Sequence, residues 1–323
     1  MGLLRKPREN GRRQGLKILV YGVDGSGKSL FGLGFPRLAV IDAESKLGVY
    51  EGTERGKNII AVADTSNYYD SLEVVNEVIA SGECESLMID SETYIYEGMQ
   101  VACMEVEEER AKKKKGNIDD QIVSQRGYGK IKLNASRLKL LKAQASAKGV
   151  TIISTAHKED IMQKVGENNI KVGEKPSLRK NSNHDFDVIL RFYKEKDLAT
   201  GEYKFFAEVE KDTTETLKLG SIVENPSYDL FKNYIENNNK LEIIETNYDK
   251  TIENNMETME NEAKDFDTLV EEFETIFKKL KEQDKENITK VKELLTKYKV
   301  DSYKKPENFD GLKEVVAELK KIA

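Results

Sequence analysis

Residues 22–29 read Gly22-Val23-Asp24-Gly25-Ser26-Gly27-Lys28-Ser29, which fits the phosphate-binding pattern G-x-x-x-x-G-K-[ST] at every required position. The apolar run 16–21 comes before them, and Leu30 and Phe31 begin an apolar helix face after them. Glycines in such a loop let the chain turn tightly, so that successive backbone N–H groups point at one anion. The stretch therefore predicts a strand, a phosphate-binding loop (P-loop) and a helix that together bind a nucleotide.

The side chains of the P-loop have separate expected roles. Lys28 is expected to reach the β- and γ-phosphates, and Ser29 is expected to give a hydroxyl ligand to Mg²⁺, which prefers oxygen donors. The nucleotide-binding residues that the motif predicts are Gly22, Asp24, Gly25, Ser26, Gly27, Lys28, Ser29 and Leu30.

Length and charge limit the class of protein. With 323 residues the chain is long enough for one sizeable α/β domain and a smaller second domain. The formal net charge of -6 argues against a surface that coats nucleic acid uniformly, although local basic patches remain compatible with it.

Cysteine and histidine content argues against a structural zinc site. Cys84 and Cys103 have no C-x-x-C spacing, and His157 and His184 are the only histidines. The small number of cysteines fits a reducing, intracellular compartment. No apolar stretch approaches the roughly 20 residues that span a bilayer, and the basic start is not followed by a secretory apolar core. We therefore expect a cytoplasmic protein with no membrane partner.

Short apolar runs alternate with longer amphipathic segments from residue 17 onward. This alternation indicates a mostly parallel sheet covered by helices on both faces. Residues 203–209 follow the turn signal 199–201 and are expected to pair with 188–194 as an edge hairpin. The apolar runs expected to form strands after the P-loop are 38–41, 59–62, 87–89, 150–154 and 188–192.

Composition divides the chain into four parts. Residues 1–15 carry five basic residues against Glu9 and indicate a basic flexible arm, for which a merely solvated tail is an equal alternative. Residues 16–240 are expected to form the α/β domain, and 241–265, rich in Glu, Asn and Thr, an acidic linker. The helical period returns at Phe266, so we expect 266–323 to form a small helical module.

A second nucleotide signal is the apolar run 87–89, which ends in Asp90. This is the form of a Walker B element, whose carboxylate holds the Mg²⁺ shell, so Asp90 joins Ser29 as a predicted metal residue. Hydrolysis also needs a base or a group that positions water, and Glu44 and Glu92 compete for that role. Both follow predicted strands, where ligands bind in such sheets, and position alone does not separate them.

These motifs together resemble a known family. The P-loop, Ile41-Asp42-Ala43-Glu44 and Ile89-Asp90-Ser91 resemble, in order and spacing, the ATPase core of RecA and RadA recombinases. The resemblance covers residues 16–222 and is nearest to the shorter RecA-like ATPases of bacteriophages, of the single-strand-annealing recombinase type. It implies an α/β RecA-like P-loop ATPase core with a mostly parallel sheet, a small C-terminal helical domain, and ATP and Mg²⁺ as cofactors. It also implies that Glu44 activates the attacking water, with Glu92 in reserve.

The resemblance implies two further residues at the γ-phosphate. His157 stands where RecA-like proteins have a polar γ-phosphate sensor, and an ordinary histidine at a strand end is the alternative. Recombinase sites lie between subunits, and Lys211 is the expected cation from the neighbouring subunit. Thr213 stands where the family has a second basic residue, so Arg179 or Lys180 can serve instead. Such sites imply a homo-oligomer, either a filament or a ring.

Two segments, 97–127 and 158–184, correspond to the mobile loops with which RecA-like proteins hold single-stranded DNA. Lysines on such loops release phosphate counterions on binding, which gives salt-sensitive affinity. A charge run is also common on a solvated surface, and the acidic stretch 105–109 comes directly before this one. The predicted DNA-binding residues are Lys112, Lys113, Lys114, Lys115, Lys175, Arg179 and Lys180.

The sequence therefore predicts a DNA-stimulated ATPase that binds single-stranded DNA and promotes strand annealing or pairing in phage recombination or replication. The alternative is a nucleotide-gated assembly or loader protein, whose C-terminal module recruits a phage or host replication or recombination protein. Residues 266–323 contain too few motifs to choose between DNA and a partner protein.

Overall fold

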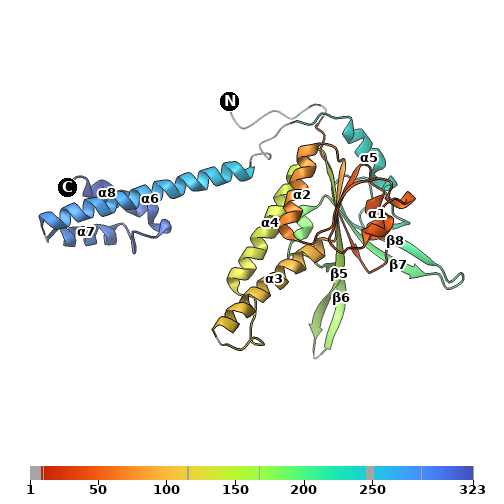
Figure 1. The fold of residues 1–323 in the computed structure, drawn as a ribbon, viewed down its shortest axis with the longest axis horizontal. Coiled ribbons are helices and arrows are strands. Elements are labelled where there is room, and N and C mark those ends of the chain that lie inside the picture. Colours follow the sequence, from red (N-terminus) through yellow and green to blue (C-terminus); the bar gives the residue numbers. More distant parts are fainter. Residues whose placement is uncertain are drawn as a thin grey trace. The chain divides into compact units, whose positions relative to one another are not determined.

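The P-loop strand lies inside a mostly parallel sheet, which Figure 1 shows for the computed structural model. The structure describes residues 9, 11–114, 116–166, 168–244, 251–284 and 286–322. Across these residues the strand order is β3-β2-β4-β5-β1-β7-β8-β9, and β6 pairs with β5 outside this order. Strands β6, β8 and β9 are antiparallel to their neighbours and the others are parallel. The strands are β1 (Lys17–Gly22), β2 (Leu38–Asp42), β3 (Ile59–Ala63), β4 (Ser86–Asp90), β5 (Thr151–Val165), β6 (Asn168–Pro176), β7 (Val188–Lys196), β8 (Tyr203–Asp212) and β9 (Ile222–Glu224).

The central strands are buried on both faces, because neighbouring residues of a strand point to opposite sides of the sheet. On one face Val40 belongs to a core that includes Phe31 of α1 and Phe231 of α5. On the other face Ile41 packs in a core with Val75 of α2, and α3 and α4 complete that layer (Figure 1). The expected fold class, α/β with a mostly parallel sheet covered by helices on both faces, is confirmed. The helices are α1 (Lys28–Leu33), α2 (Tyr68–Ser81), α3 (Glu92–Lys113), α4 (Gln125–Ala147) and α5 (Asp229–Asn239).

The edge hairpin expected from residues 188–194 and 203–209 is confirmed. Strands β7 and β8 pair antiparallel, with Phe192 opposite Ala207. The three-residue strand β9, which the sequence did not predict, adds to the outer side of β8.

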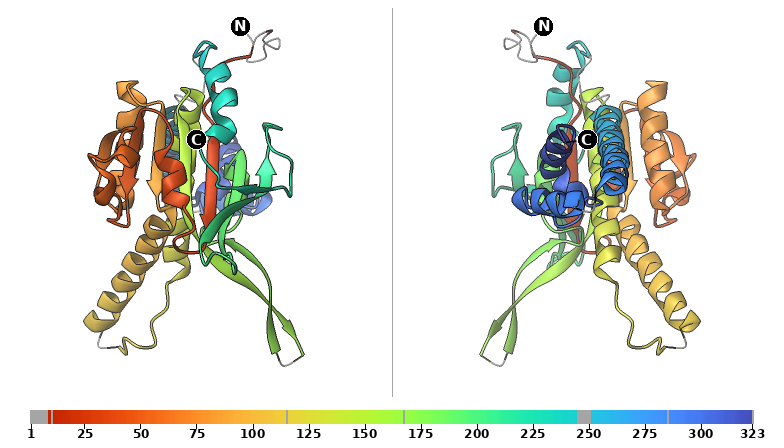
Figure 2. Two further views of the ribbon diagram at one scale, coloured as in Figure 1. Left: turned by 90° about the vertical axis from the view of Figure 1, so that its right-hand side faces the viewer. Right: turned by 90° about the vertical axis from the view of Figure 1, so that its left-hand side faces the viewer.

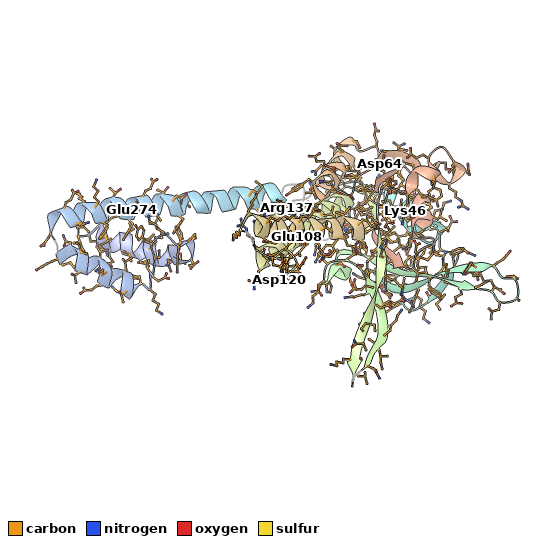
Figure 3. The ribbon with its side chains drawn as sticks, turned by 60° about the horizontal axis from the view of Figure 1, so that its bottom comes forward. Lys46, Asp64, Glu108, Asp120, Arg137 and Glu274 are labelled. Carbon is orange, nitrogen blue, oxygen red and sulfur yellow. The ribbon has the colours of Figure 1, made fainter. Side chains whose placement is uncertain are left out.

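Two projections leave the sheet at the edge where β1 ends in the P-loop. One is the helical hairpin of α3 and α4, and the other is the ribbon made by the second half of β5 with β6, residues 158–176. Figure 2 shows the two projections diverging from the same edge. In Figure 3, Glu108 and Asp120 are labelled on the helical projection.

The expectation that residues 97–127 and 158–184 are mobile loops is wrong for most of their length. Helix α3 continues to Lys113, and pairs at i,i+3 spacing, Glu107 with Arg110 and Glu109 with Lys112, extend along its last turns. Most of the second segment is a paired ribbon, because backbone hydrogen bonds join residues 158–165 of β5 to β6. The basic run that suggested a loop is therefore the end of a long helix.

The N-terminal arm is hydrogen-bonded over its described part. The N–H groups of Arg13 and Gly15 donate to the carbonyl oxygens of Glu242 and Ser146, at 2.9 and 2.8 Å. Residues 11–15 are thus attached to the α/β unit, in contrast to the expected flexible arm. Residues 1–8 and 10 lie outside the described residues.

The chain divides by its contacts into two units, residues 1–248 and 249–323. In the second unit, Phe273 and Leu280 of α6 form a core with Val291 of α7 and Leu312 and Val315 of α8. This is a helical module, as residues 266–323 predicted. Its helices are α6 (Thr251–Gln283), α7 (Glu286–Lys297) and α8 (Phe309–Leu319).

The expected acidic linker 241–265 is wrong in its second half, because α6 begins at Thr251. Glu, Met, Lys and Ala, which favour helices, occur throughout 252–264. Residues 245–250 lie outside the described part of the chain. Among the described helices, none has both the length and the apolar content needed to cross a bilayer.

Candidate active site

The P-loop has the backbone that its glycines allow. Gly25 and Gly27 have φ of 64° and 94°, and a Cβ on Gly22 would lie 1.9 Å from the carbonyl oxygen of Phe192 in the adjacent strand. The Ser26 hydroxyl donates to the carbonyl of Val23 at 2.7 Å and so braces the turn from within. These features hold an open loop of backbone N–H groups at the end of β1.

Lys28 lies under this loop among negative charges. Its Nζ donates to the carbonyl oxygens of Gly22 and Val23 at 3.2 and 2.9 Å. Burial lowers the pKa of Lys28, and the nearby carboxylates of Asp90, Asp24 and Glu44 partly oppose that shift. The amine is therefore held where the P-loop binds phosphate.

Asp90 ends β4, and the residue is 5% exposed. The hydroxyl groups of Ser29 and Thr155 both donate to it. Burial raises the pKa of Asp90, although these two hydrogen bonds oppose the shift. The structure thus brings together the two predicted metal residues, Ser29 and Asp90. Oxygen donors of this kind, beside the phosphate site, fit the Mg²⁺ that accompanies a bound nucleotide.

Glu44 lies next to this pair because the end of β2 is fixed to β4. The N–H groups of Ala43 and Glu44 both donate to the carbonyl oxygen of Asp90, at 2.8 and 3.3 Å. The Glu44 carboxylate accepts from His157 at 2.8 Å, from Lys46 at 2.6 Å and from Ser91 at 2.5 Å. Burial alone would raise the pKa of Glu44, but the three donors outweigh it and bring the pKa to about 2.

His157 reaches Glu44 from the strand next to the P-loop. In the register of β1 and β5 it is the partner of Gly22, the first P-loop residue. Its backbone N–H donates to the Thr93 hydroxyl at 3.0 Å, and its ring meets Tyr94 edge-on at 5.7 Å. The hydrogen bond to Glu44 raises the pKa of His157. The predicted sensor and the predicted base are therefore in direct contact.

Glu92, the reserve candidate for the catalytic base, has a different partner. Its carboxylate pairs with Lys142 of α4 at 2.6 Å, and the Lys142 side chain is 3% exposed. The Lys142 ammonium also lies 4.5 Å from the centre of the Phe186 ring. Glu92 is thus part of a buried ion pair between α3 and α4, whereas the charge of Glu44 acts on both Lys28 and Asp90.

Two of the three cations expected to act across a subunit boundary, Lys211 and Arg179, have partners within their own chain. Lys211 donates to the carbonyl oxygens of Asn183 and Phe186, at 3.2 Å for Asn183. Arg179 pairs with Asp185. Both side chains therefore brace the segment between β6 and β7.

The predicted DNA-binding residues lie on different parts of the fold. Lys112 and Lys113 end α3, and Lys112 pairs with Glu109 at 3.1 Å. Lys175 lies on β6, where Glu159 is 3.5 Å away. Lys114 caps α3, Lys180 precedes η3 (Ser182–Asp185), and Lys115 lies outside the described residues.

Sequence reasoning missed four residues of this site: Lys46, Ser91, Thr155 and Lys194. Thr155 had a detectable signal, because a hydroxyl in a fully buried strand needs a partner. Lys46, labelled in Figure 3, lies two residues beyond Glu44 and has no local pattern that marks it. Lys194 lies on β7, and its Nζ is 3.0 Å from the position of a Cβ on Gly25.

Comparison with known proteins identifies the family of this chain. A search of curated proteins found no match. Among solved structures, the flagellar accessory protein FlaH from Methanocaldococcus jannaschii is similar, with 13% sequence identity and a TM-score of 0.39, over 67% of this chain and 87% of that chain. A family model described as an AAA domain matches residues 14–218. The match covers more than half of the chain, so the protein belongs to this AAA-domain family and is a P-loop ATPase.

Proposed function

We propose that the protein uses ATP hydrolysis to control binding to single-stranded DNA, and that it promotes strand annealing or pairing in phage recombination or replication. Glu44 is the base that activates water, Ser29 and Asp90 hold Mg²⁺, and His157 senses the γ-phosphate. The observation that carries the proposal is the continuity of β5. This strand leads from Thr151 in the core, through His157 beside Glu44, to Val165 near the tip of the ribbon.

The second projection also begins at the nucleotide site. Helix α3 starts at Glu92, two residues after Asp90, and ends at Lys113. Both projections are thus rigid extensions of segments that contact the catalytic residues. When hydrolysis changes the contacts of His157 or Ser91, the ribbon and the helical projection can therefore move, and we propose that these two projections bind the DNA.

The cations available to bind phosphate are fewer than the sequence suggested. On the ribbon, Lys158 and Lys171 both pair with Glu174, at 2.7 and 2.6 Å. Lys113, Lys164 and Lys180 are three of the lysines in these segments that have no ion-pair partner among the described residues. We infer that these three lysines bind the DNA phosphates.

The test is steady-state ATP hydrolysis with and without single-stranded DNA, at low and moderate salt, beside Glu44→Gln. The proposal predicts salt-sensitive stimulation that Glu44→Gln abolishes. Replacing Lys113, Lys164 and Lys180 by Gln should weaken DNA binding for all sequences. It should also flatten the plot of log K against log salt by roughly 0.7 for each lysine that binds a phosphate in the parent protein. Unchanged DNA affinity in this triple variant contradicts the lysine assignment.

A matched control carries the same change of charge away from the projections. Replacing Lys57, Lys218 and Lys232 by Gln removes three exposed lysines from other surfaces of the same unit. This control should bind DNA as the parent protein does. An equal loss of affinity in both triple variants means that net charge, rather than a defined surface, controls the affinity.

A second candidate function is a nucleotide-gated assembly or loader protein. The observation that favours it is the exposed apolar face of the ribbon, where Ile161, Val165 and Ile170 lie on one side. An exposed apolar surface of this kind fits a protein partner, and the helical module offers a second docking site. Hydrolysis that is indifferent to DNA favours this function. In both cases we propose a filament or ring of identical subunits, which sedimentation with and without ATP tests.

A further inference from the structure

A lysine of the edge hairpin reaches the P-loop from the side opposite the catalytic carboxylates. Lys194 lies on β7, and its Nζ is 3.0 Å from the position that a Cβ on Gly25 would occupy. Asp90, Glu44 and His157 come from β4, the end of β2, and β5, all on the other side of β1. A lysine therefore lies on one flank of the P-loop, and two carboxylates and a histidine lie on the other.

Lys194 shares its flank with an exposed aromatic ring. Its ammonium lies 5.4 Å from the centre of the Tyr203 ring, and Tyr203 is 55% exposed. Tyr203 is the register partner of Lys196, so Phe192, Lys194 and Tyr203 share one face of the hairpin. Phe192 packs edge-on against Phe31 of α1 at 5.5 Å, which shows that this face is the one turned toward α1 and the P-loop.

The charge balance of the site calls for a second cation. Lys28 is close enough to Asp24, Asp90 and Glu44 for all three carboxylates to act on its pKa. Lys46 neutralises part of this charge at Glu44, at 2.6 Å, so Asp24 and Asp90 remain beside Lys28. A polyphosphate carries several negative charges of its own, and a further cation on the other flank of the loop would favour its binding. Lys194 has no ion-pair partner among the described residues, and it lies against the loop at Gly25, next to Asp24.

We propose that Lys194 and Tyr203 form the nucleoside half of the nucleotide site. Lys194 binds the α- and β-phosphates, and the Tyr203 ring stacks on the base. Ser29, Asp90 and Glu44 fix the γ-phosphate end on one flank, so the nucleoside extends away from them toward the hairpin. This inference rests on nucleotide binding and not on DNA binding, so it can fail or hold whether or not DNA stimulates hydrolysis.

The first test is equilibrium binding of ATP and of ADP to Lys194→Gln. Binding of Lys194 to the α- and β-phosphates predicts that Kd rises about tenfold for both nucleotides, because the variant cannot form the charge-assisted hydrogen bond. The control is Lys196→Gln, the next lysine on the same face of β7, which should bind both nucleotides normally. Unchanged Kd, or a fall in kcat with Kd unchanged, overturns the assignment.

The second test distinguishes binding of the base from binding of the phosphates. Tyr203→Ala should weaken ATP and ADP binding several-fold but leave the affinity for inorganic triphosphate unchanged, since triphosphate has no base. Tyr203→Phe keeps the ring and should bind like the parent protein. An equal loss of affinity for triphosphate, or no loss for ATP, overturns the stacking role. Both side chains are exposed, so these variants should fold.

Discussion

The Nε2 atom of His157 lies 2.8 Å from the Oε1 atom of Glu44. This contact joins the proposed sensor to the proposed base, and Lys46 and Ser91 complete the set of donors around the same carboxylate. A carboxylate with a pKa of about 2 is ionised at every working pH, but it is also a weak base. Its reactivity therefore depends on how firmly these donors hold it.

Glu44→Gln should lower kcat for ATP hydrolysis by at least about 100-fold, because the variant has no group to take the proton from water. The affinity for ATP should remain, since the P-loop and Lys28 are unchanged. Single-turnover hydrolysis and equilibrium nucleotide binding measure the two effects separately. Hydrolysis at the parental rate in this variant would show that another group activates water.

The hydrolysis rate should increase with pH at values above 6.5. The pKa of His157 is raised from its ordinary 6.5, so the imidazolium persists into that range and holds Glu44 in a charge-assisted hydrogen bond. As the pH rises through the raised pKa, the imidazole becomes neutral and Glu44 becomes a stronger base. A pH profile of kcat measures this step, which is the increase in hydrolysis rate as His157 loses its proton.

His157→Gln should remove this step, and His184→Gln should keep it. His184 is the only other histidine and is exposed in η3, so it is a matched control for the chemistry of the side chain.

The hydrogen bond between His157 and Glu44 also makes the stability of the fold depend on pH. A raised His157 pKa stabilises the fold fully below pH 6.5, and this contribution is lost as the pH rises through the raised value.

The sequence was sufficient to predict site residues where a local pattern marks them. The P-loop, Asp90 and Glu44 each come directly after an apolar run, and parallel strands bring such ends to one edge of the sheet. The contact of His157 with Glu44 had no local signal, because the two residues are 113 positions apart. It depends on the insertion of β5 between β1 and β4, which only the strand order reveals.

Charge patterns were the less reliable guide. The run around Lys113 suggested a loop, yet ion pairs with preceding acidic residues make it a helix end. Lys211 was expected to act on a neighbouring subunit, but backbone carbonyls of its own chain bind its ammonium. The fold determines which group a long charged side chain contacts, so residue type alone does not identify the partner.

Glu92→Gln should lower the free energy of unfolding by about 3 kcal/mol, because it leaves the buried Lys142 ammonium without its counter-charge. Urea denaturation of the two variants Glu92→Gln and Glu44→Gln checks the distinction between a structural and a catalytic carboxylate. The double variant Glu92→Leu with Lys142→Met removes both charges and should recover most of the stability. No recovery would mean that the pair contributes more than charge balance.

Phe273→Ala should unfold the helical module but leave ATP hydrolysis intact. Phe273 is buried in the module core, stacks on Phe277 with ring centres 5.9 Å apart, and lies 4.9 Å from Tyr303, so its truncation should cost about 3–5 kcal/mol. Hydrogen exchange of α6 to α8 measures the unfolding, and Ile322→Ala is the control because that side chain is exposed. Every proposed catalytic residue belongs to the first unit, so hydrolysis should continue at the parental rate. A parallel fall in hydrolysis would show that the ATPase unit depends on the module for its activity.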